Sequence, residues 1–335
     1  MIRFALIVAS VLGFALTAAL GNLMVPLLRE LERSLRGQAP DPKTEPQHKP
    51  LQPVPALGGL CLMVGTLAAV GVGWVAACAA QPSLLGSDGN LMTRLLIALA
   101  GALAFGGIGL ADDLARVRSG YLNGLGLRLG LEAAAAAAVL GLLALNGCLP
   151  GGLILPGKGY VSFAAAPLLW GVLLVALAEC GRVADGADGT VCGAAFAAML
   201  GLMLLETQLG WFPLAVLPAA LAGALMAFLL WNFPPAKLRP GKCGCLFLTG
   251  AIGCIPLCMG YAELAVPLAL PFWAEGGMVL LQILSYRLTG RTLFRAAPLH
   301  RWLGKRGHGD VSIFCSLCAL SVCGLALTMG LARWA

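Results

Sequence analysis

Charge is scarce in this chain. Of its 335 residues only 11% are Asp, Glu, Lys or Arg, whereas a soluble globular domain carries roughly 25%. Because 59% of the residues are hydrophobic, too few polar groups remain to cover a water-facing surface. Long polar stretches that could fold as a separate soluble domain are lacking too, since apolar runs recur along the whole length. These shortages exclude an ordinary soluble protein and predict an all-α polytopic membrane protein, with 1–335 as a single integral membrane domain.

Evidence for a secreted disulfide framework is also lacking, although the chain has 12 cysteines. Such frameworks are short, loop-rich chains, whereas these cysteines lie mostly inside apolar runs, where cysteine behaves as a small hydrophobe. Cys315 and Cys318 form a CxxC within one such run. We expect core packing for this pair rather than a redox or metal-binding role.

Ten segments are long and apolar enough to cross a bilayer, which requires about 20 residues. They are 4–27, 57–79, 93–111, 126–146, 164–180, 190–207, 213–231, 246–261, 263–286 and 311–333. The ninth contains Pro267, Pro271 and two adjacent glycines, so we expect a break or a strong bend there. The Gly/Pro-punctuated stretch 147–163 predicts a small hairpin between two spans.

Basic residues are distributed unevenly between the two sides of these spans, which argues against nucleic-acid binding as the origin of the +7 net charge. Four basic residues fall on the N-terminal side: Arg3, Arg94, Lys158 and Arg333. The other 18 fall in connections at about 28–56, 112–125, 181–189, 232–245 and 287–310. The positive-inside rule therefore predicts that these five loops are cytoplasmic and that both termini are outside. Arg29, Arg33 and Arg36 outweigh Arg3, which favours an uncleaved first helix over a signal peptide.

Acidic side chains at a membrane are costly and are therefore candidates for function. Asp112 and Asp113 follow the third span, and Asp185 and Asp188 lie in the glycine-rich segment GRVADGADG. An i, i+3 spacing would place the second pair on one face if that segment were helical. Paired carboxylates can hold Mg²⁺ or act as a base, while the alternative is that they cap helix ends and balance nearby arginines. His300, in FRAAPLHRW, is the other polar residue of note at this side.

Five segments, in order, are similar to motifs of one family of membrane transferases. HK at 48–49 with VPALGG at 54–59 resembles HKKKAGTPTMGG, and GLADDLARV at 109–117 resembles GxxDDxxKV. DGADG at 185–189 resembles the end of TDGLDG, and WNFPPAKLRPGKCGCL at 231–246 resembles FNxxPAxxFMGDTGSL. RTLFRAAPLH at 291–300 resembles RIFxMAPIHHHFE. The chain therefore resembles the phospho-N-acetylmuramoyl-pentapeptide transferases of the polyprenyl-phosphate N-acetylhexosamine-1-phosphate transferase superfamily, glycosyl transferase family 4.

This resemblance implies ten helices in a bacterial cytoplasmic membrane, a cytoplasmic active-site cleft, and a homodimer. It implies transfer of a phospho-N-acetylmuramoyl-pentapeptide, or another phospho-N-acetylhexosamine, from a UDP-sugar to undecaprenyl phosphate, with UMP release and Mg²⁺ as cofactor. Carried over position by position, it assigns catalytic roles to Asp112, Asp113, Asp188 and His300, the first two also as metal ligands. It assigns substrate binding to His48, Lys49, Arg116, Asp185, Gly186 and Asn232.

Several positions depart from the family pattern. Lys242 replaces the Mg²⁺-binding aspartate of MGDTGS, Arg182 replaces an asparagine, and Arg239 replaces the phenylalanine expected to stack on uracil. Arg116 and Gly130 replace two lysines. An ammonium group in place of an oxygen ligand opposes Mg²⁺ binding in the usual way, and these exchanges predict a more positive pocket.

Two interpretations stay open. In the first, the chain is an active transferase with altered metal use. In the second, it is a catalytically impaired relative that binds polyprenyl phosphate or acts as a scaffold. A transporter is less well supported, because the acids lie at the rim of the bundle rather than at its midplane.

Overall fold

The computed structural model describes residues 2–36, 54–82, 90–119 and 124–334, and most of them lie in helices. The long helices are α1 (Ile2–Arg36), α2 (Gly59–Ala80), α4 (Asn90–Ser119), α5 (Leu125–Leu145), α6 (Ala166–Ala184), α7 (Thr190–Gln208), α8 (Val216–Asn232), α9 (Gly241–Met259), α11 (Leu270–Thr289) and α13 (Asp310–Leu331). Short helical segments are η1 (Ala262–Leu264), α10 (Ala265–Leu268), α12 (Leu299–Lys305) and η2 (Ala332–Trp334). Each predicted span coincides with one of the long helices.

Within the described part of the chain, eight helices are long and apolar enough to cross a membrane. The protein is therefore a polytopic all-α membrane protein. Residues 262–268 and α11 form a ninth candidate span, bent by 78°, which confirms the predicted bend between Pro267 and Pro271. The apolar α8 is shorter, with 17 residues. The count of ten spans and the side on which the termini lie stay predictions.

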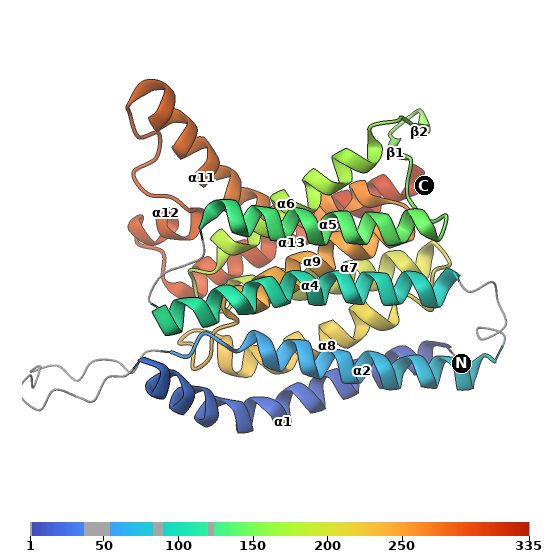
Figure 1. Ribbon diagram of the computed structural model, residues 1–335, viewed down its shortest axis with the longest axis horizontal. Coiled ribbons are helices and arrows are strands. Elements are labelled where there is room, and N and C mark those ends of the chain that lie inside the picture. The colour runs from blue at the N-terminus through green and yellow to red at the C-terminus, as the bar shows by residue number, and fades with distance from the viewer. Residues whose placement is uncertain (1, 37–53, 83–89, 120–123, 335) are drawn as a thin grey trace, which may run out of the picture.

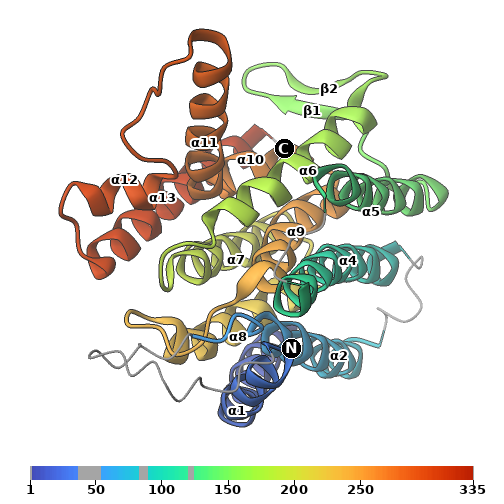
Figure 2. The ribbon, with the colours of Figure 1, turned by 60° about the vertical axis from the view of Figure 1, so that its left-hand side comes forward.

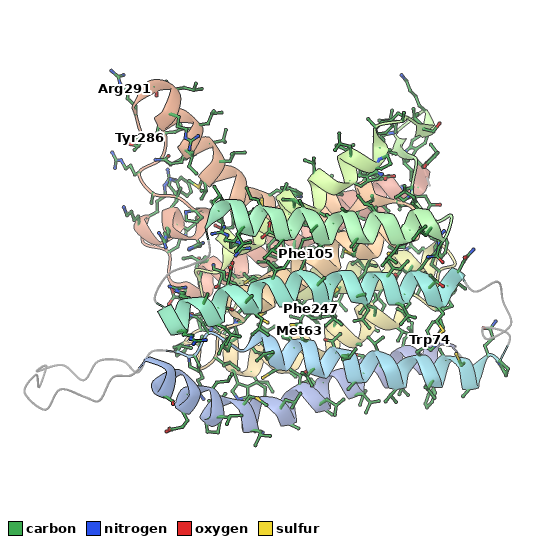
Figure 3. All side chains as sticks on the ribbon, in the orientation of Figure 1. Met63, Trp74, Phe105, Phe247, Tyr286 and Arg291 are labelled. Atoms are coloured by element: carbon green, nitrogen blue, oxygen red, sulfur yellow. The ribbon has the colours of Figure 1, made fainter. Side chains whose placement is uncertain are left out.

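The helices run roughly parallel or antiparallel, with α9 in the middle of the bundle (Figures 1 and 2). Nearly every residue of α9 is buried, and it packs against α2, α4, α6 and α7. Phe105 on α4, Phe247 on α9 and Met63 on α2 lie together in this interior (Figure 3). By contrast, α11 leans away from the bundle and carries exposed Tyr286 near its end (Figure 3).

The two ends of the bundle differ. Both ends of the described chain lie at one end, together with the antiparallel hairpin of β1 (Gly152–Leu155) and β2 (Gly159–Ser162) (Figure 1). This hairpin confirms the prediction for 147–163. The other end, here called the basic end, is where α1 and α4 finish and α5 begins.

Two glycines let α2 and α4 approach the first turn of α9 closely. A Cβ added at Gly109 of α4 would collide with the carbonyl oxygen of Lys242, and one at Gly59 of α2 would collide with the backbone of Gly244. Small residues at helix crossings permit such backbone contact in membrane proteins. These crossings set the position of the acids that follow Gly109.

All 12 cysteines are free thiols, as expected for a chain without a disulfide framework. Core packing was wrong for Cys315, which is exposed on α13, while Cys318 is half-buried. An apolar run on an outer helix includes positions that face away from the protein, so hydropathy alone does not distinguish the two faces.

Candidate functional site

Asp112 and Asp113 lie within α4 rather than after it. The helix continues to Ser119, past the predicted end of the span at residue 111, and both carboxylates are buried. Oδ2 of Asp113 accepts a hydrogen bond of 2.9 Å from the backbone N–H of Cys243 in the first turn of α9. A carboxylate at a helix N-terminus is stabilised by the unpaired N–H groups there. Asp113 therefore fixes α4 to the start of α9.

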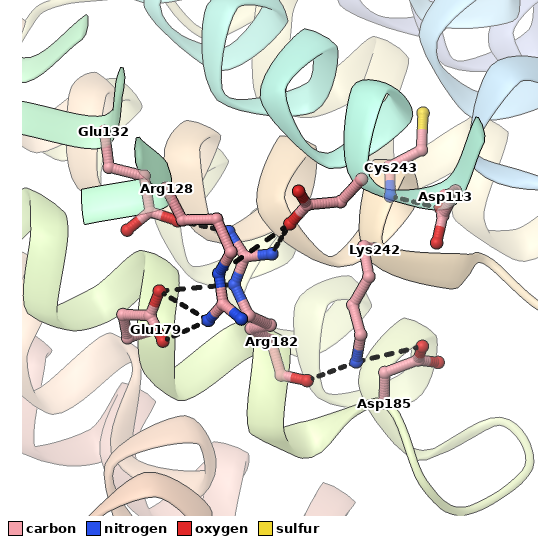
Figure 4. Close-up of polar contacts among 9 residues, drawn as sticks. Asp113, Arg128, Glu132, Glu179, Arg182, Asp185, Lys242 and Cys243 are labelled. Atoms are coloured by element: carbon pink, nitrogen blue, oxygen red, sulfur yellow. Dashed lines mark hydrogen bonds and ion pairs between the residues drawn. The ribbon is translucent and has the colours of Figure 1, made fainter. Parts of the chain in front are cut away.

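Asp112 belongs to a buried group of charges from three helices, here called the Arg182 cluster: Asp112, Arg128, Glu132, Glu179 and Arg182 (Figure 4). Arg182 donates to both Asp112 and Glu132, and its Nε lies 3.3 Å from Oε1 of Glu179. Arg128 donates to both carboxylate oxygens of Glu179 at 3.2 Å, and its Nε lies 3.9 Å from Oδ2 of Asp112. Two guanidinium groups thus pair with three carboxylates, of which Asp112 and Glu132 are buried, and such pairing is how buried charges are tolerated.

The segment 185–189 is a turn between α6 and α7, so the expectation of a shared helical face for Asp185 and Asp188 is not met. Gly189 has a φ of 76°, a conformation that favours glycine and breaks the helix. Lys242 extends from α9 to this turn: its Nζ donates to the carbonyl oxygen of Arg182 at 2.6 Å and lies 3.5 Å from Oδ2 of Asp185 (Figure 4).

Asp188 pairs with Arg239. Nη2 and Nε of Arg239 donate to Oδ1 of Asp188 at 2.8 and 3.1 Å, and the backbone N–H of Ala236 donates to Oδ2 at 3.0 Å. The backbone of Arg239 is fixed by the segment before α2, since its N–H donates to Pro55 and its carbonyl accepts from Gly58. Two positions that depart from the family pattern, 239 and 242, each contact one acid of the 185–189 turn. We call Arg239–Asp188 and Lys242–Asp185 the rim pairs.

His300, in α12, contacts the same turn from another side. Its Nδ1 lies 3.0 Å from Oε2 of Glu275 on α11, and its backbone N–H donates to Oε1 at 3.2 Å. A Cβ added at Gly186 would collide with Nε2 of His300, so the imidazole lies directly against the turn. The carboxylate of Glu275 thereby sets the orientation of the imidazole ring.

Six of the predicted site residues therefore come together at the basic end: Asp112, Asp113, Asp185, Gly186, Asp188 and His300. Arg116 is exposed on the last turn of α4. The buried side chain of Asn232 donates to the carbonyl of Leu238 at 2.9 Å and so holds its own loop. His48 and Lys49 lie outside the described residues. Gly130 is exposed, and a Cβ there would meet nothing within 4 Å.

Sequence reasoning missed Arg128, Glu132 and Glu179. Glu132 could have been found from the sequence, because it directly precedes the alanine run of a membrane helix, where a single acid is costly unless it is paired. Its partner, Arg182, lies 50 residues away in the sequence, and no local pattern connects the two. The two extra acids also offset the positive charge that the departures from the family pattern were expected to add.

An apolar groove of about 590 Å³ runs between α5 and α6 and reaches this charged region. Its walls include Ala133, Ala136 and Leu140 of α5 with Leu168 and Val172 of α6. The one charged residue lining it is Glu179, which belongs to the Arg182 cluster. A hydrocarbon chain lying in this groove would have its polar end near that cluster.

The resemblance implies Mg²⁺ at Asp112 and Asp113 with a third oxygen ligand at position 242. The residues present do not fit that arrangement, because Asp112 is paired with Arg182, Asp113 accepts from the backbone of α9, and position 242 carries an ammonium group. Across the described residues, no three His, Cys, Asp or Glu side chains form a group that could hold a metal ion.

Comparison with known proteins agrees with the motifs. Residues 95–260 match the model of glycosyl transferase family 4. The phospho-N-acetylmuramoyl-pentapeptide-transferase of Mycobacterium bovis (strain BCG / Pasteur 1173P2) is 30% identical over 320 residues, covering 86% of this chain and 87% of the relative. Those of Mycobacterium sp. (strain JLS) and Clostridium kluyveri are 30% and 28% identical, covering 96% and 93% of this chain and 97% and 95% of the relatives. The chain therefore belongs to glycosyl transferase family 4, as a divergent member similar to the phospho-N-acetylmuramoyl-pentapeptide transferases.

Proposed function

We propose that this protein acts in bacterial peptidoglycan synthesis, at the step that joins a phospho-sugar to a polyprenyl phosphate in the cytoplasmic membrane. The donor would be UDP-N-acetylmuramoyl-pentapeptide or a related UDP-N-acetylhexosamine, and the acceptor undecaprenyl phosphate. An oxygen of the lipid phosphate forms a bond to the phosphorus that carries the sugar, the bond from that phosphorus to UMP breaks, and UMP leaves.

The observation that carries this proposal is the convergence of distant motif segments on one place. Segments around Pro55, Asp112, Asp185 and His300 meet at the start of α9, at the basic end of the bundle. The apolar groove between α5 and α6 leads to the same place. A membrane-facing groove for a hydrocarbon chain beside cations for phosphate is what an enzyme acting on a polyprenyl phosphate requires. The homodimer implied by the resemblance remains part of the proposal.

In a second candidate function the protein does not transfer a phospho-sugar. It is then a catalytically impaired relative that binds polyprenyl phosphate or acts as a scaffold. The ion pair between Arg182 and Asp112 favours it, because a carboxylate held by a buried guanidinium group is a poor base. Lys242 at a metal-ligand position favours it as well.

One experiment separates the two. Purified protein in lipid nanodiscs is supplied with UDP-N-acetylmuramoyl-pentapeptide and undecaprenyl phosphate, and UMP release is measured beside Asp112→Asn, while lipid binding is followed in the same preparation. UMP release above that of Asp112→Asn supports the transferase. Lipid binding with no release above that level supports the impaired relative. If the protein neither binds undecaprenyl phosphate nor releases UMP, both functions are wrong.

A further inference from the structure

Three cations of the site occupy positions where the family motifs have an acidic or an uncharged residue. Three acids of the site, Asp112, Asp185 and Asp188, each lie against a cation from another segment of the chain. Those cations are Arg182, Lys242 and Arg239, the three residues that replace an asparagine, an aspartate and a phenylalanine of the family motifs. Each of the three acids thus contacts a cation that departs from the family motifs, so we treat the three departures as one arrangement.

We propose that the site at the basic end binds the phosphate or diphosphate group of its ligand without a divalent cation, and that Arg239 and Lys242 are the side chains that contact it. The inference deepens the proposed function and rests on it for the source of the phosphate, which is either the lipid or the nucleotide. The inference gives Arg239 and Lys242 a role in ligand binding and Arg182 a structural role, although the sequence alone does not distinguish these cations.

Exposure separates Arg239 from Arg182, and a longer ion pair separates Lys242 from Arg182. The side chain of Arg182 is 5% exposed and contacts three carboxylates, so an incoming anion would have to displace buried partners. The side chain of Arg239 is 43% exposed and pairs with a single carboxylate. The side chain of Lys242 is 13% exposed, and its Nζ keeps a hydrogen bond of 2.6 Å to the carbonyl of Arg182, but it lies 3.5 Å from the carboxylate of Asp185, beyond a short charge-assisted hydrogen bond. These two cations can exchange an aspartate for a phosphate, whereas Arg182 cannot do so without exposing buried charges.

The backbone around these two cations is held in place. Arg239 and Pro240 exchange hydrogen bonds with Pro55, Gly58 and Gly59, so the loop before α9 is tied to the start of α2. Gly241 sits between the two cations at a φ of 65°. A fixed backbone under exchangeable side chains lowers the conformational entropy lost when a ligand binds. An arginine fork with a neighbouring ammonium group matches the oxygens of a phosphate.

A divalent cation in the same place would meet these charges directly. Mg²⁺ prefers an octahedron of oxygen ligands and is held by carboxylates together with substrate phosphates. To bind at Asp185 it would have to displace the ammonium group of Lys242, and to bind at Asp112 it would have to displace the guanidinium group of Arg182. The energy of both ion pairs opposes metal binding. A phosphate also has to displace a carboxylate from each rim pair, but it leaves the buried pair of Arg182 with Asp112 intact and binds cations that are already present.

The test uses the full-length protein in nanodiscs and inorganic diphosphate as the probe, titrated by calorimetry in EDTA and again in Mg²⁺. We expect equal affinities in the two buffers. Arg239→Ala and Lys242→Ala should each weaken binding by about tenfold or more, because each removes a charged hydrogen-bond donor. Lys158→Ala, an exposed lysine at the opposite end of the bundle, is the matched control and should leave the affinity unchanged.

Three results would overturn the inference: binding that requires Mg²⁺, binding that survives unchanged in both alanine variants, or no diphosphate binding in either buffer. Parallel titrations with undecaprenyl phosphate and with UDP identify the source of the phosphate, since only the true source should compete with diphosphate. They also keep the two proposals apart. Mg²⁺-dependent diphosphate binding together with lipid binding would leave the proposed function intact and the inference wrong. Metal-free diphosphate binding with no binding of lipid or UDP-sugar would leave the inference intact and the proposed function wrong.

Discussion

The centre of the Arg182 cluster, Arg182 with Asp112 and Glu132, and the Arg239–Asp188 rim pair are built from the same kinds of side chain at the same end of the bundle, yet they differ in depth. In the cluster, the side chains of Arg182, Asp112 and Glu132 are 5%, 1% and 0% exposed. In the Arg239–Asp188 rim pair, the two side chains are 43% and 16% exposed. Depth decides how strongly each charge depends on its partner, because water replaces a lost partner only where it can reach.

This comparison shows why a substitution of similar chemistry can have a structural role at one position and a binding role at another. Arg182 and Arg239 both add a guanidinium group to the family pattern. One crosslinks α4, α5 and α6 through buried carboxylates, and the other holds a turn at the rim. Three measurements would break or sharpen this distinction.

The largest effect is expected from Arg182→Asn, which restores the residue of the family motif but removes the guanidinium group that pairs with both Asp112 and Glu132. Removal of one partner from a buried ion pair costs about 3–5 kcal/mol, so the free energy of unfolding should fall by that amount. Unfolding in detergent, followed by circular dichroism, measures it. Arg118→Ala, an exposed arginine on the last turn of α4, serves as the control. Wild-type stability in Arg182→Asn would mean that the cluster does not hold the helices together.

An intermediate effect is expected from Glu275→Ala, which removes the acceptor of both the N–H and the Nδ1 of His300. Hydrogen bonds to charged groups contribute about 1.5–3 kcal/mol, so α12 should open more readily, and its amides should exchange faster with deuterium. Gln282→Ala is the matched control, because Gln282 anchors the neighbouring backbone of Phe294 from the same helix. Faster exchange at 291–296 but not in α12 is the expected pattern for that control. Unchanged exchange of α12 in Glu275→Ala would contradict the assigned role of the pair.

The smallest effect on stability is expected from Arg239→Ala. Partly exposed ion pairs contribute about 0.2–1 kcal/mol, so the unfolding midpoint should barely move even though the variant loses affinity for diphosphate. The same unfolding measurement in detergent tests whether the midpoint moves. A loss comparable to that of Arg182→Asn would show that the rim pair is structural, and the distinction between the two groups would disappear.

Much of the fold followed from the sequence, because hydropathy marks spans directly. The ten apolar segments, the bend between Pro267 and Pro271, and the hairpin at 147–163 all correspond to elements of the structure. The location of Asp112, Asp185 and His300 at one end was also predictable, because successive loops alternate between the two sides of the membrane and these residues lie in or next to loops of the same side.

What the sequence could not supply was the partner of each charge. The pairing of Glu132 with Arg182 joins helices separated by 50 residues, and periodicity within one helix carries no information about its neighbour. The length of α4 was also misjudged, because polar residues at its end suggested a loop although they continue the helix to Ser119. Those added turns bury Asp112 and Asp113 instead of leaving them in a connection.

The buried contact between Glu132 and Arg182 also constrains how such a chain could have diverged. An arginine at 182 without an acid at 132 would lose one of its three carboxylate partners, whereas a glutamic acid at 132 without the arginine can stay protonated in the interior. Gaining the acid first, or together with the arginine, is therefore the less costly order. Among relatives, we expect an arginine at position 182 to occur with an acid at position 132.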